Sequence, residues 1–186
     1  MSAPDKQRLV SLLAKRSARR GSFTLASGKQ SSLYIDARLT TMSPDGLSLI
    51  GPLGLDAIRN AQWPADSVGG LTLGADPIAY AISYASAHTA SPIRAFTVRK
   101  EAKAHGTGKL IEGPFAAGDR VVVVEDVITT GSSAARAVDA VRAAGATVLG
   151  VLALVDRDEG GRESLEAMGL SVVSLVSAAE ILALSA

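Results

Sequence analysis

Hydrophobic and polar positions along this chain follow the period of a helix in some segments and the period of a strand in others. In residues 4–19 the apolar positions recur every three to four residues, which predicts an amphipathic helix. The segment 23–36 favours two short strands around a glycine-containing turn. A second helix is predicted over about 44–60, because Ser43 is a suitable N-cap for it.

Beyond this helix, short apolar runs alternate with amphipathic segments. The apolar runs predict strands near 67–71, 93–98, 121–125, 147–155 and 171–176, and the intervening segments predict helices over 76–88, 132–144 and 160–168, with a terminal helix after the last strand. Nearly continuous apolar strands that alternate with helices are typical of a mostly parallel sheet flanked by helices on both faces. We therefore expect an α/β fold in a single domain spanning residues 1–186.

One long segment, residues 99–118, has no periodic pattern. A loop of this length within a compact domain usually acts as a lid or a binding loop, or is disordered.

Composition and charge narrow the classes of function. The formal net charge is +1, so no overall field draws the protein to nucleic acid or to a membrane. The absence of cysteine excludes disulfides, thiolate nucleophiles and cysteine-ligated zinc. The N-terminal segment lacks the apolar core of a signal peptide, and no apolar run approaches the roughly 20 residues of a membrane span. A soluble cytoplasmic protein is the expectation.

The sequence VVVVEDVITTGSS, residues 121–133, places a polar loop between a buried strand and a helix. Open parallel sheets bind ligands at the carboxyl ends of their strands, and a helix N-terminus there offers free N–H groups to an anion. Gly131 allows close approach of the backbone, and the hydroxyl groups of Thr129, Thr130, Ser132 and Ser133 are further donors. This loop is a candidate phosphate site.

Two acids, Glu125 and Asp126, follow the apolar run directly. Their oxygens can accept hydrogen bonds from the two vicinal hydroxyls of a ribose, so the segment suits a phosphorylated pentose better than a free phosphate. The alternative is an ordinary helix cap beside two solvated acids. The GxxxxGK[ST] and strand-linked GxGxxG nucleotide motifs are both missing.

These residues resemble the 13-residue phosphoribosyl pyrophosphate (PRPP) motif of type I phosphoribosyltransferases. A second feature fits that chemistry. The segment RKEAKAHGTGK, residues 99–109, gathers five basic side chains: Arg99, Lys100, Lys103, His105 and Lys109. Catalysis of pyrophosphate departure needs cations where charge develops, and a closing lid supplies them. The alternatives are a solvated surface loop and a nucleic-acid contact, but the segment has no aromatic residue for base stacking.

Residues 98–113 resemble the catalytic loop of orotate phosphoribosyltransferases more specifically. FTLASGKQSSLYID, residues 23–36, is similar to the N-terminal hood of that family, and LVDRDEGG, residues 154–161, is similar to its strand-end Asp-Arg. The resemblance spans roughly residues 20–161. It implies a small hood, mainly 20–40, on a type I phosphoribosyltransferase fold, and a mobile catalytic loop of about 99–114.

The resemblance also implies an activity and its residues. Orotate and PRPP would give orotidine 5'-monophosphate and pyrophosphate in pyrimidine (UMP) synthesis, with Mg2+ held mainly through PRPP and without direct protein ligands. The catalytic residues would be Lys103, Lys100 and His105, of which Lys103 should matter most. The PRPP-binding residues would be Arg99, Lys100, Lys103, His105, Glu125, Asp126, Val127, Ile128, Thr129, Thr130, Gly131, Ser132 and Ser133. The orotate-binding residues would be Thr129, Arg157, Tyr34 and Ile35.

The implied partners are PRPP, orotate and a second copy of the chain, because in the family the catalytic loop reaches into the neighbouring subunit. Neither nucleic acid nor a membrane is an expected partner. Three positions depart from many bacterial relatives, which carry a Lys where this chain has Ala26 and a Tyr-Lys pair at the aligned positions Leu73 and Gly74. Backbone N–H groups of Gly74 and Ala75 would substitute for that cation.

Two other functions remain open. A related phosphoribosyltransferase would use uracil or a purine, which the candidate carboxylate-binding Arg157 argues against. A non-catalytic PRPP-sensing regulator on the same fold would need a nucleic-acid-binding surface, which the near-neutral charge argues against.

Overall fold

The computed structural model describes residues 3–24, 30–101 and 109–184. Its helices are α1 (Ala3–Leu12), the π-helical η1 (Leu13–Ser17), α2 (Arg38–Thr41), α3 (Pro44–Asn60), α4 (Ala75–Ser86), α5 (Ser132–Ala143), α6 (Gly161–Glu166) and α7 (Ala178–Leu184). Its strands are β1 (Ala18–Thr24), β2 (Gln30–Ile35), β3 (Ser67–Leu71), β4 (Arg94–Val98), β5 (Ile111–Glu112), β6 (Arg120–Ile128), β7 (Thr147–Asp156) and β8 (Val172–Ser177). In the described part of the chain, no helix has the length and apolar character needed to cross a membrane.

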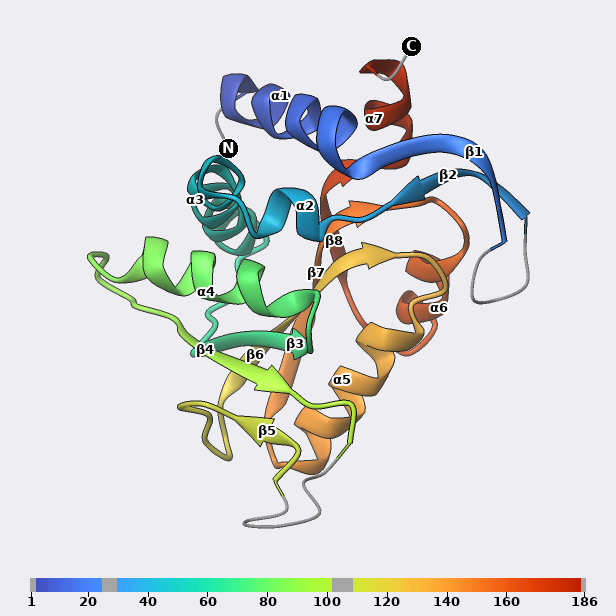
Figure 1. Cartoon of the computed structure of the whole chain (residues 1–186). Coiled ribbons are helices and arrows are strands. Elements are labelled where there is room, and N and C mark those ends of the chain that lie inside the picture. The colour runs from blue at the N-terminus through green and yellow to red at the C-terminus, as the bar shows by residue number, and fades with distance from the viewer. Residues whose placement is uncertain (1–2, 25–29, 102–108, 185–186) are drawn as a thin grey trace.

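A six-stranded sheet forms the centre of the molecule (Figure 1). Its strand order is β5-β4-β3-β6-β7-β8, and every pair is parallel except β4 with β5. The predicted mostly parallel sheet is confirmed. Because the parallel strands share one direction, the loops that follow β3, β4, β6 and β7 emerge at the same edge, where ligands bind in folds of this kind.

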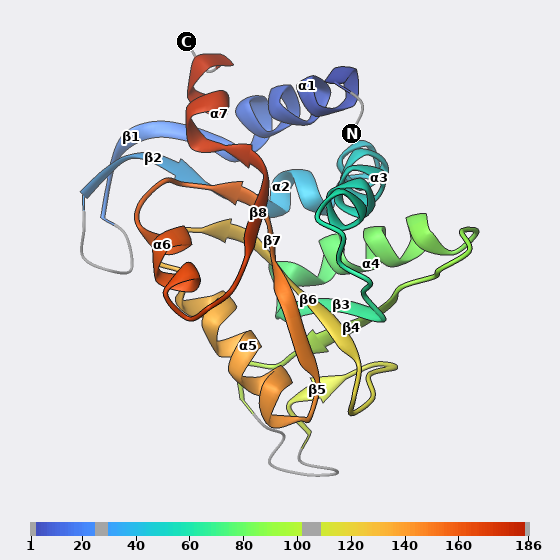
Figure 2. The same cartoon turned by 180° about the vertical axis from the view of Figure 1, so that it is seen from behind.

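Helices cover both faces of the sheet (Figures 1 and 2). In β6 the side chains of Val122 and Val124 join a core with α1, α3 and α4, whereas Val121 and Val123 join a second core with α5 and α6. All four valines are fully buried. The alternation follows from the two-residue period of a strand, and it explains why the run contains no polar residue.

The hood is a separate two-stranded sheet formed by antiparallel β1 and β2. It extends alongside the carboxyl ends of β7 and β8 (Figures 1 and 2). Leu33 and Ile35 pack into the core beneath it, and Arg20 Nη2 donates a hydrogen bond to the carbonyl oxygen of Leu182 in α7 at 2.9 Å. These contacts hold the hood over the edge of the sheet where the predicted site residues lie.

The predicted helix over 4–19 is confirmed as helical up to Ser17 and is wrong at its last two residues. Helix α1 ends at Leu12, a π-helical turn continues to Ser17, and β1 begins at Ala18. Ala18 pairs with Ile35, and Asp36 N donates to the carbonyl oxygen of Ser17 at 2.9 Å. Pairing with a distant strand therefore overrides the local helical pattern, as tertiary contacts often do.

Further predictions need correction. Strand β6 does not end at residue 125 but continues to Ile128, because its pairing with β7 extends to Ile128 opposite Asp156. The segment 99–118, predicted to be irregular, contains the short strand β5, which pairs with β4. Strand β1 begins at Ala18 rather than near residue 23, and α2 was not predicted. The other predicted elements agree with the structure to within two residues, and Ser43 Oγ caps α3 by accepting a hydrogen bond from Gly46 N at 3.2 Å.

The docking of α1 gives a test of this core. Leu9 of α1 is fully buried, whereas Leu184 of α7 is 55 % exposed. Leu9→Ala should lower the free energy of unfolding by about 2–5 kcal/mol, because it leaves a cavity. Leu184→Ala should cost less than about 0.5 kcal/mol. Urea denaturation of both variants measures this, and equal losses would mean that α1 does not belong to the cooperative core.

Candidate active site

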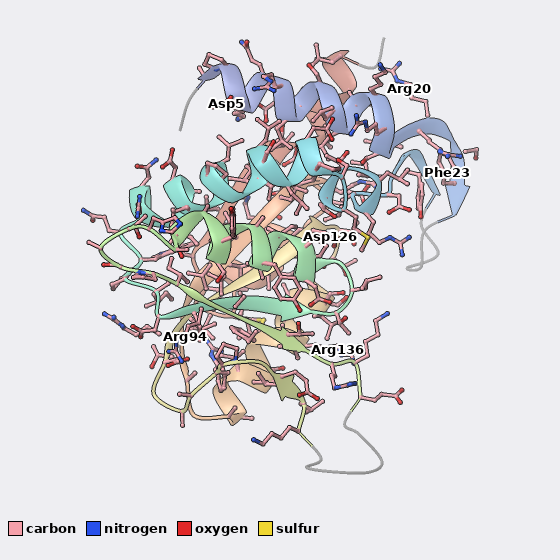
Figure 3. All side chains as sticks on the ribbon, turned by 60° about the vertical axis from the view of Figure 1, so that its left-hand side comes forward. Asp5, Arg20, Phe23, Arg94, Asp126 and Arg136 are labelled. Atoms are coloured by element: carbon pink, nitrogen blue, oxygen red, sulfur yellow. The ribbon has the colours of Figure 1, made fainter. Side chains whose placement is uncertain are left out.

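A cavity of about 300 Å3 opens at the carboxyl edge of the sheet, beneath the hood. Its lining comes from residues 34–38 at the end of the hood, residues 71–74 after β3, Lys100 after β4, residues 125–127 of β6 and Ser133 of α5. The fold therefore brings together parts of the hood, the predicted phosphate segment and the basic loop. Figure 3 shows Asp126 in the space between the hood and the sheet.

The two adjacent acids of β6 are largely buried. Burial, followed by the nearby charge of Asp126, raises the pKa of Glu125 to about 9. Glu125 Oε2 has no hydrogen-bond partner among the described residues. Burial also raises the pKa of Asp126, although its Oδ1 accepts a hydrogen bond from Val127 N at 2.9 Å. The ligand-free site thus holds a protonated Glu125 at neutral pH, with a buried oxygen available to a ligand hydroxyl.

The loop after β6 leads into the N-terminus of α5. Gly131 caps that helix with a φ of 77°, a conformation that favours glycine, and a Cβ atom there would lie 2.8 Å from the carbonyl oxygen of Gly161. Thr130 Oγ1 donates to Ser132 Oγ at 3.1 Å, and Ser133 lines the cavity. Ile128 is buried in the core and supports the loop from below. Free N–H groups and hydroxyls therefore gather where a phosphate was predicted.

The loop after β3 approaches Asp126 from the other side. A Cβ atom at Gly74 would overlap with the Asp126 carboxylate, so this position accommodates only glycine unless Asp126 moves. The peptide bond between Thr72 and Leu73 is cis. Leu73 and Gly74 both line the cavity, so the two departures predicted from sequence to affect the site do lie in it.

Asp76, at the start of α4, anchors that loop. Its side chain is buried and accepts hydrogen bonds from Thr72 Oγ1 at 2.7 Å and from Thr97 Oγ1 of β4 at 2.9 Å. The hydroxyl of Tyr80 lies 2.9 Å from Thr97 Oγ1, and the Tyr80 side chain is exposed on α4. This chain of hydrogen bonds links the end of β3, the end of β4 and the surface of α4.

Four predicted orotate residues approach from two directions. Tyr34 and Ile35 line the cavity, and Tyr34 lies against Phe23 with ring centroids 5.5 Å apart. Thr129 and Arg157 do not line it. Arg157 follows β7, donates its backbone N–H to the carbonyl oxygen of Ile128 at 3.0 Å, and places Nη2 2.6 Å from Glu159 Oε1. Its guanidinium therefore already binds a carboxylate.

The turn that carries Arg157 is fixed by its neighbour Asp156. This buried carboxylate accepts hydrogen bonds from Arg162 Nε at 2.8 Å and from Asp158 N at 3.0 Å. Arg162 also donates to Ser174 Oγ and to the carbonyl oxygen of Val172 in β8. A buried charge held by several hydrogen bonds resists displacement, so the backbone at Arg157 is firmly positioned.

The basic loop is described at its two ends. Arg99 lies outside the cavity lining and donates from Nε to Glu112 Oε1 at 3.2 Å. Lys100 lines the cavity, and its carbonyl oxygen accepts a hydrogen bond from Arg136 Nη2 at 2.9 Å, with Arg136 labelled in Figure 3. Lys103 and His105 lie outside the described residues, as does Ala26.

Sequence reasoning missed three residues at this site: Asp36, Arg38 and Asp76. The first two form an acid–base pair directly after β2, a signal that was available once the hood had been assigned. Asp76 follows the glycine-containing loop after β3, but only the fold reveals its two threonine partners. In the described ranges, no cluster of three or more acidic or histidine side chains could hold a metal ion by itself.

Comparison with known proteins agrees with this geometry. Residues 60–176 match the phosphoribosyl transferase domain family. The orotate phosphoribosyltransferase of Aquifex aeolicus is 46% identical over 181 residues, which cover 96% of this chain and 98% of that protein. The enzyme of the same name from Mycobacterium tuberculosis is 45% identical and covers 97% of this chain and 98% of its own length.

Solved structures agree as well. The crystal structure of Mycobacterium tuberculosis orotate phosphoribosyltransferase in complex with PRPP superposes with a TM-score of 0.80 at 42% identity, over 96% of this chain and 99% of that one. The Aeropyrum pernix orotate phosphoribosyltransferase gives a TM-score of 0.77 at 38% identity, over 94% and 96% of the two chains. The expected type I fold is confirmed, and this chain belongs to the orotate phosphoribosyltransferase family of phosphoribosyl transferase domain proteins.

Proposed function

We propose that this protein is an enzyme that transfers the phosphoribosyl group of PRPP to orotate, giving orotidine 5'-monophosphate and pyrophosphate in pyrimidine biosynthesis. Its membership of the family supports this activity. The observation that carries the proposal in the structure is the buried acid pair Glu125–Asp126, which shares one cavity with the hood and with Lys100.

The β6 segment would hold the ribose 5-phosphate. The ribose hydroxyls donate to Glu125 and Asp126, and the phosphate accepts hydrogen bonds from the backbone and hydroxyls of residues 129–133. Glu125 Oε2 is buried and has no partner within the described chain, so an incoming hydroxyl replaces no existing bond there. Such a hydroxyl satisfies a buried acceptor, which adds to affinity.

The residues present also suit the Mg2+ that this activity implies. The described part of the chain has no metal-binding cluster of its own, and Glu125 and Asp126 are acceptors for ribose hydroxyls and for cation-bound water. The ion would be held mainly through PRPP itself. When bound, Mg2+ supplies positive charge to the leaving pyrophosphate.

The base would lie between the hood and the turn after β7. The backbone of Tyr34 and Ile35 would supply N–H and C=O groups to the pyrimidine ring, and Thr129 would supply a further hydroxyl group. Arg157 binds the carboxylate that distinguishes orotate from uracil. The bond from Arg157 to Glu159 at 2.6 Å supports this role, because the guanidinium already has a carboxylate partner. Orotate would then compete with Glu159 for the same donor.

The chemistry needs no protein nucleophile. Pyrophosphate leaves the ribose C1, which gains oxocarbenium character, and the orotate nitrogen attacks C1 from the opposite face. Lys100, Lys103 and His105 place positive charge beside the departing oxygens, and His105 can also donate a proton to them. Arg99, whose guanidinium is paired with Glu112, would join them only after leaving that partner.

We also propose that the enzyme is a homodimer in which each catalytic loop serves the neighbouring site. Support comes from an apolar surface depression of about 580 Å3 between α3 and α4, with Tyr80 and Tyr84 at its border. Tyr84 is 82 % exposed, and Leu39 and Met42 are also partly exposed in α2 and its end. Apolar surface of this kind is typical of an interface.

We propose in addition that the protein is cytoplasmic, because highly charged PRPP does not cross membranes unaided.

Arg157 gives the test of substrate choice. The protein is mixed with Mg2+, PRPP and either orotate, uracil, adenine or hypoxanthine, and pyrophosphate release is followed. Orotate should be the active acceptor, and Arg157→Met should lower kcat/KM for orotate on the order of a hundredfold because a charged pair is lost. Arg142→Met, an exposed change on α5, is the control. Release with uracil or a purine but not with orotate would exclude the proposal, and release with no base would favour a regulator.

The raised pKa of Glu125 predicts that the stability of the protein depends on pH. Its pKa is about 9 in the folded protein, against an ordinary value of 4.5, so the folded state retains a proton that the unfolded state loses between these values. The contribution of this retained proton to the free energy of unfolding is complete below about pH 4.5 and is lost as pH rises towards 9. Between pH 5 and pH 8, the ligand-free wild type should therefore lose roughly 1–4 kcal/mol more unfolding free energy than Glu125→Gln. Parallel curves in urea denaturation would contradict this assignment.

Mixing two inactive variants tests the shared loop. Lys103→Ala removes a loop cation, and Arg157→Met removes a base contact in the core of the site. If loops act between subunits, mixed dimers have one intact site, and re-associated mixtures should regain roughly a quarter of wild-type activity, as a symmetric dimer requires. No recovery would place each loop over its own subunit.

Sedimentation of Tyr84→Asp, with Tyr84→Phe as its control, tests whether the α3–α4 face holds the dimer together.

A further inference from the structure

Arg38 is a cationic side chain in the cavity that neither the phosphate segment nor the basic loop provides. It is the first residue of α2, directly after the hood strand β2, and it lines the cavity together with Gly74, Lys100 and Asp126. Arg38 and Lys100 are the cationic side chains of that lining within the described residues. They face three acids, which are Asp36, Glu125 and Asp126.

The Arg38 guanidinium is held in a fixed direction by Asp36. Nε donates to Asp36 Oδ1 at 2.8 Å and Nη2 donates to Asp36 Oδ2 at 3.0 Å, which is the two-pronged geometry of a strong arginine–carboxylate pair. Asp36 itself is held by the bond from its N–H to the carbonyl oxygen of Ser17 at 2.9 Å. Within the described residues Nη1 makes no hydrogen bond, and 49 % of the Arg38 side chain is exposed. An oriented donor therefore remains for a ligand.

Arg38 and Asp126 line the same cavity together with residues 72–74, whereas residues 129–132 do not line it. The charge of Arg38 lowers the pKa of Asp126, against the larger effect of burial, and Asp126 in turn raises the pKa of Arg38 after the larger effect of Asp36. Arg38 is therefore in a position to act on a group bound beside Asp126 and residues 72–74.

The 72–74 loop cannot supply a cation to this part of the cavity. Position 74 is glycine, and a Cβ atom there would overlap with the Asp126 carboxylate unless Asp126 moved. Thr72 is committed to Asp76, and Leu73 is apolar. An anionic group bound beside this loop therefore depends on other lining residues for positive charge, and the described cations of the lining are Arg38 and Lys100.

We propose that Arg38 binds the pyrophosphate group of PRPP from the hood side of the cavity, supplying the positive charge that the loop around Gly74 does not. Asp36 is its positioning residue, because the pair fixes the guanidinium while leaving Nη1 to the substrate. Arginine suits this place because its planar guanidinium group can donate hydrogen bonds to Asp36 from one edge and to phosphate oxygens from another. The assignment rests on the proposed function, which identifies the ligand of this cavity as PRPP.

The test compares Arg38→Met and Arg38→Lys with wild type in two measurements. Binding of magnesium pyrophosphate, without orotate or ribose, is measured by calorimetry, and KM is measured separately for PRPP and for orotate. Arg38→Met should weaken pyrophosphate binding and raise the KM for PRPP on the order of ten- to a hundredfold, since hydrogen bonds to a charged group are lost. The KM for orotate should stay within about twofold.

Conservative variants separate binding from a structural role. Arg38→Lys should recover part of the pyrophosphate affinity, and Asp36→Asn should lower it less than Arg38→Met, because the guanidinium keeps its charge but loses its orientation. Arg8→Met, which removes the same charge from the exposed Arg8–Asp5 pair of α1, is the matched control and should leave both values unchanged. Melting temperatures of all variants confirm that each is folded.

Two outcomes would overturn the assignment. Pyrophosphate affinity of folded Arg38→Met within about twofold of wild type would mean that Arg38 does not touch this group. A rise in KM confined to orotate would place Arg38 at the base instead. Absence of wild-type turnover with orotate would overturn the proposed function alone, because the pyrophosphate titration tests Arg38 without any base.

Discussion

The position of β6 is the constraint from which the rest of the structure follows. It is hydrogen-bonded to β3 on one side and to β7 on the other, and its valines fill the cores on both faces. A strand enclosed in this way can carry polar side chains only towards its ends. Glu125 and Asp126 therefore stand near its carboxyl end, beyond Val123, where the pairing with β3 stops, and the loop that turns into α5 begins after Ile128. The burial of β6 thus determines both the fold and the position of the site.

The cavity divides its chemistry between the sheet and the elements around it. The sheet contributes acceptors, because Glu125 and Asp126 are part of β6. The cations come from outside: Arg38 follows the hood, and Lys100 follows β4. Burial keeps Glu125 protonated in the ligand-free protein, which limits the negative charge that an anionic substrate meets on entry. The arrangement accepts a strongly charged ligand without being strongly charged itself.

The features of the fold and of the site that could be predicted from the sequence are those that depend on local patterns. The parallel sheet followed from apolar runs that recur between amphipathic helices, and the acid pair with its hydroxyl loop was visible because it is contiguous in the chain. The end of the first helix was mispredicted because Ala18 pairs with Ile35, a contact that no local period contains. Arg38 was missed although it follows the hood segment closely in the sequence, because its pairing with Asp36 and its place in the cavity become visible only in the fold. The confinement of Gly74 by Asp126 likewise exists only after folding.

The hydrogen bonds of Asp76 connect parts of the molecule that are otherwise separate. From the exposed hydroxyl of Tyr80 the chain passes through Thr97 to both oxygens of Asp76 and ends at Thr72, at the rim of the cavity. Tyr80 also borders the apolar depression between α3 and α4. Whatever covers that depression changes the solvation of the first hydrogen bond, and a ligand at the rim changes the last. By thermodynamic reciprocity, if binding at one end changes affinity at the other, the second must change affinity at the first by the same factor.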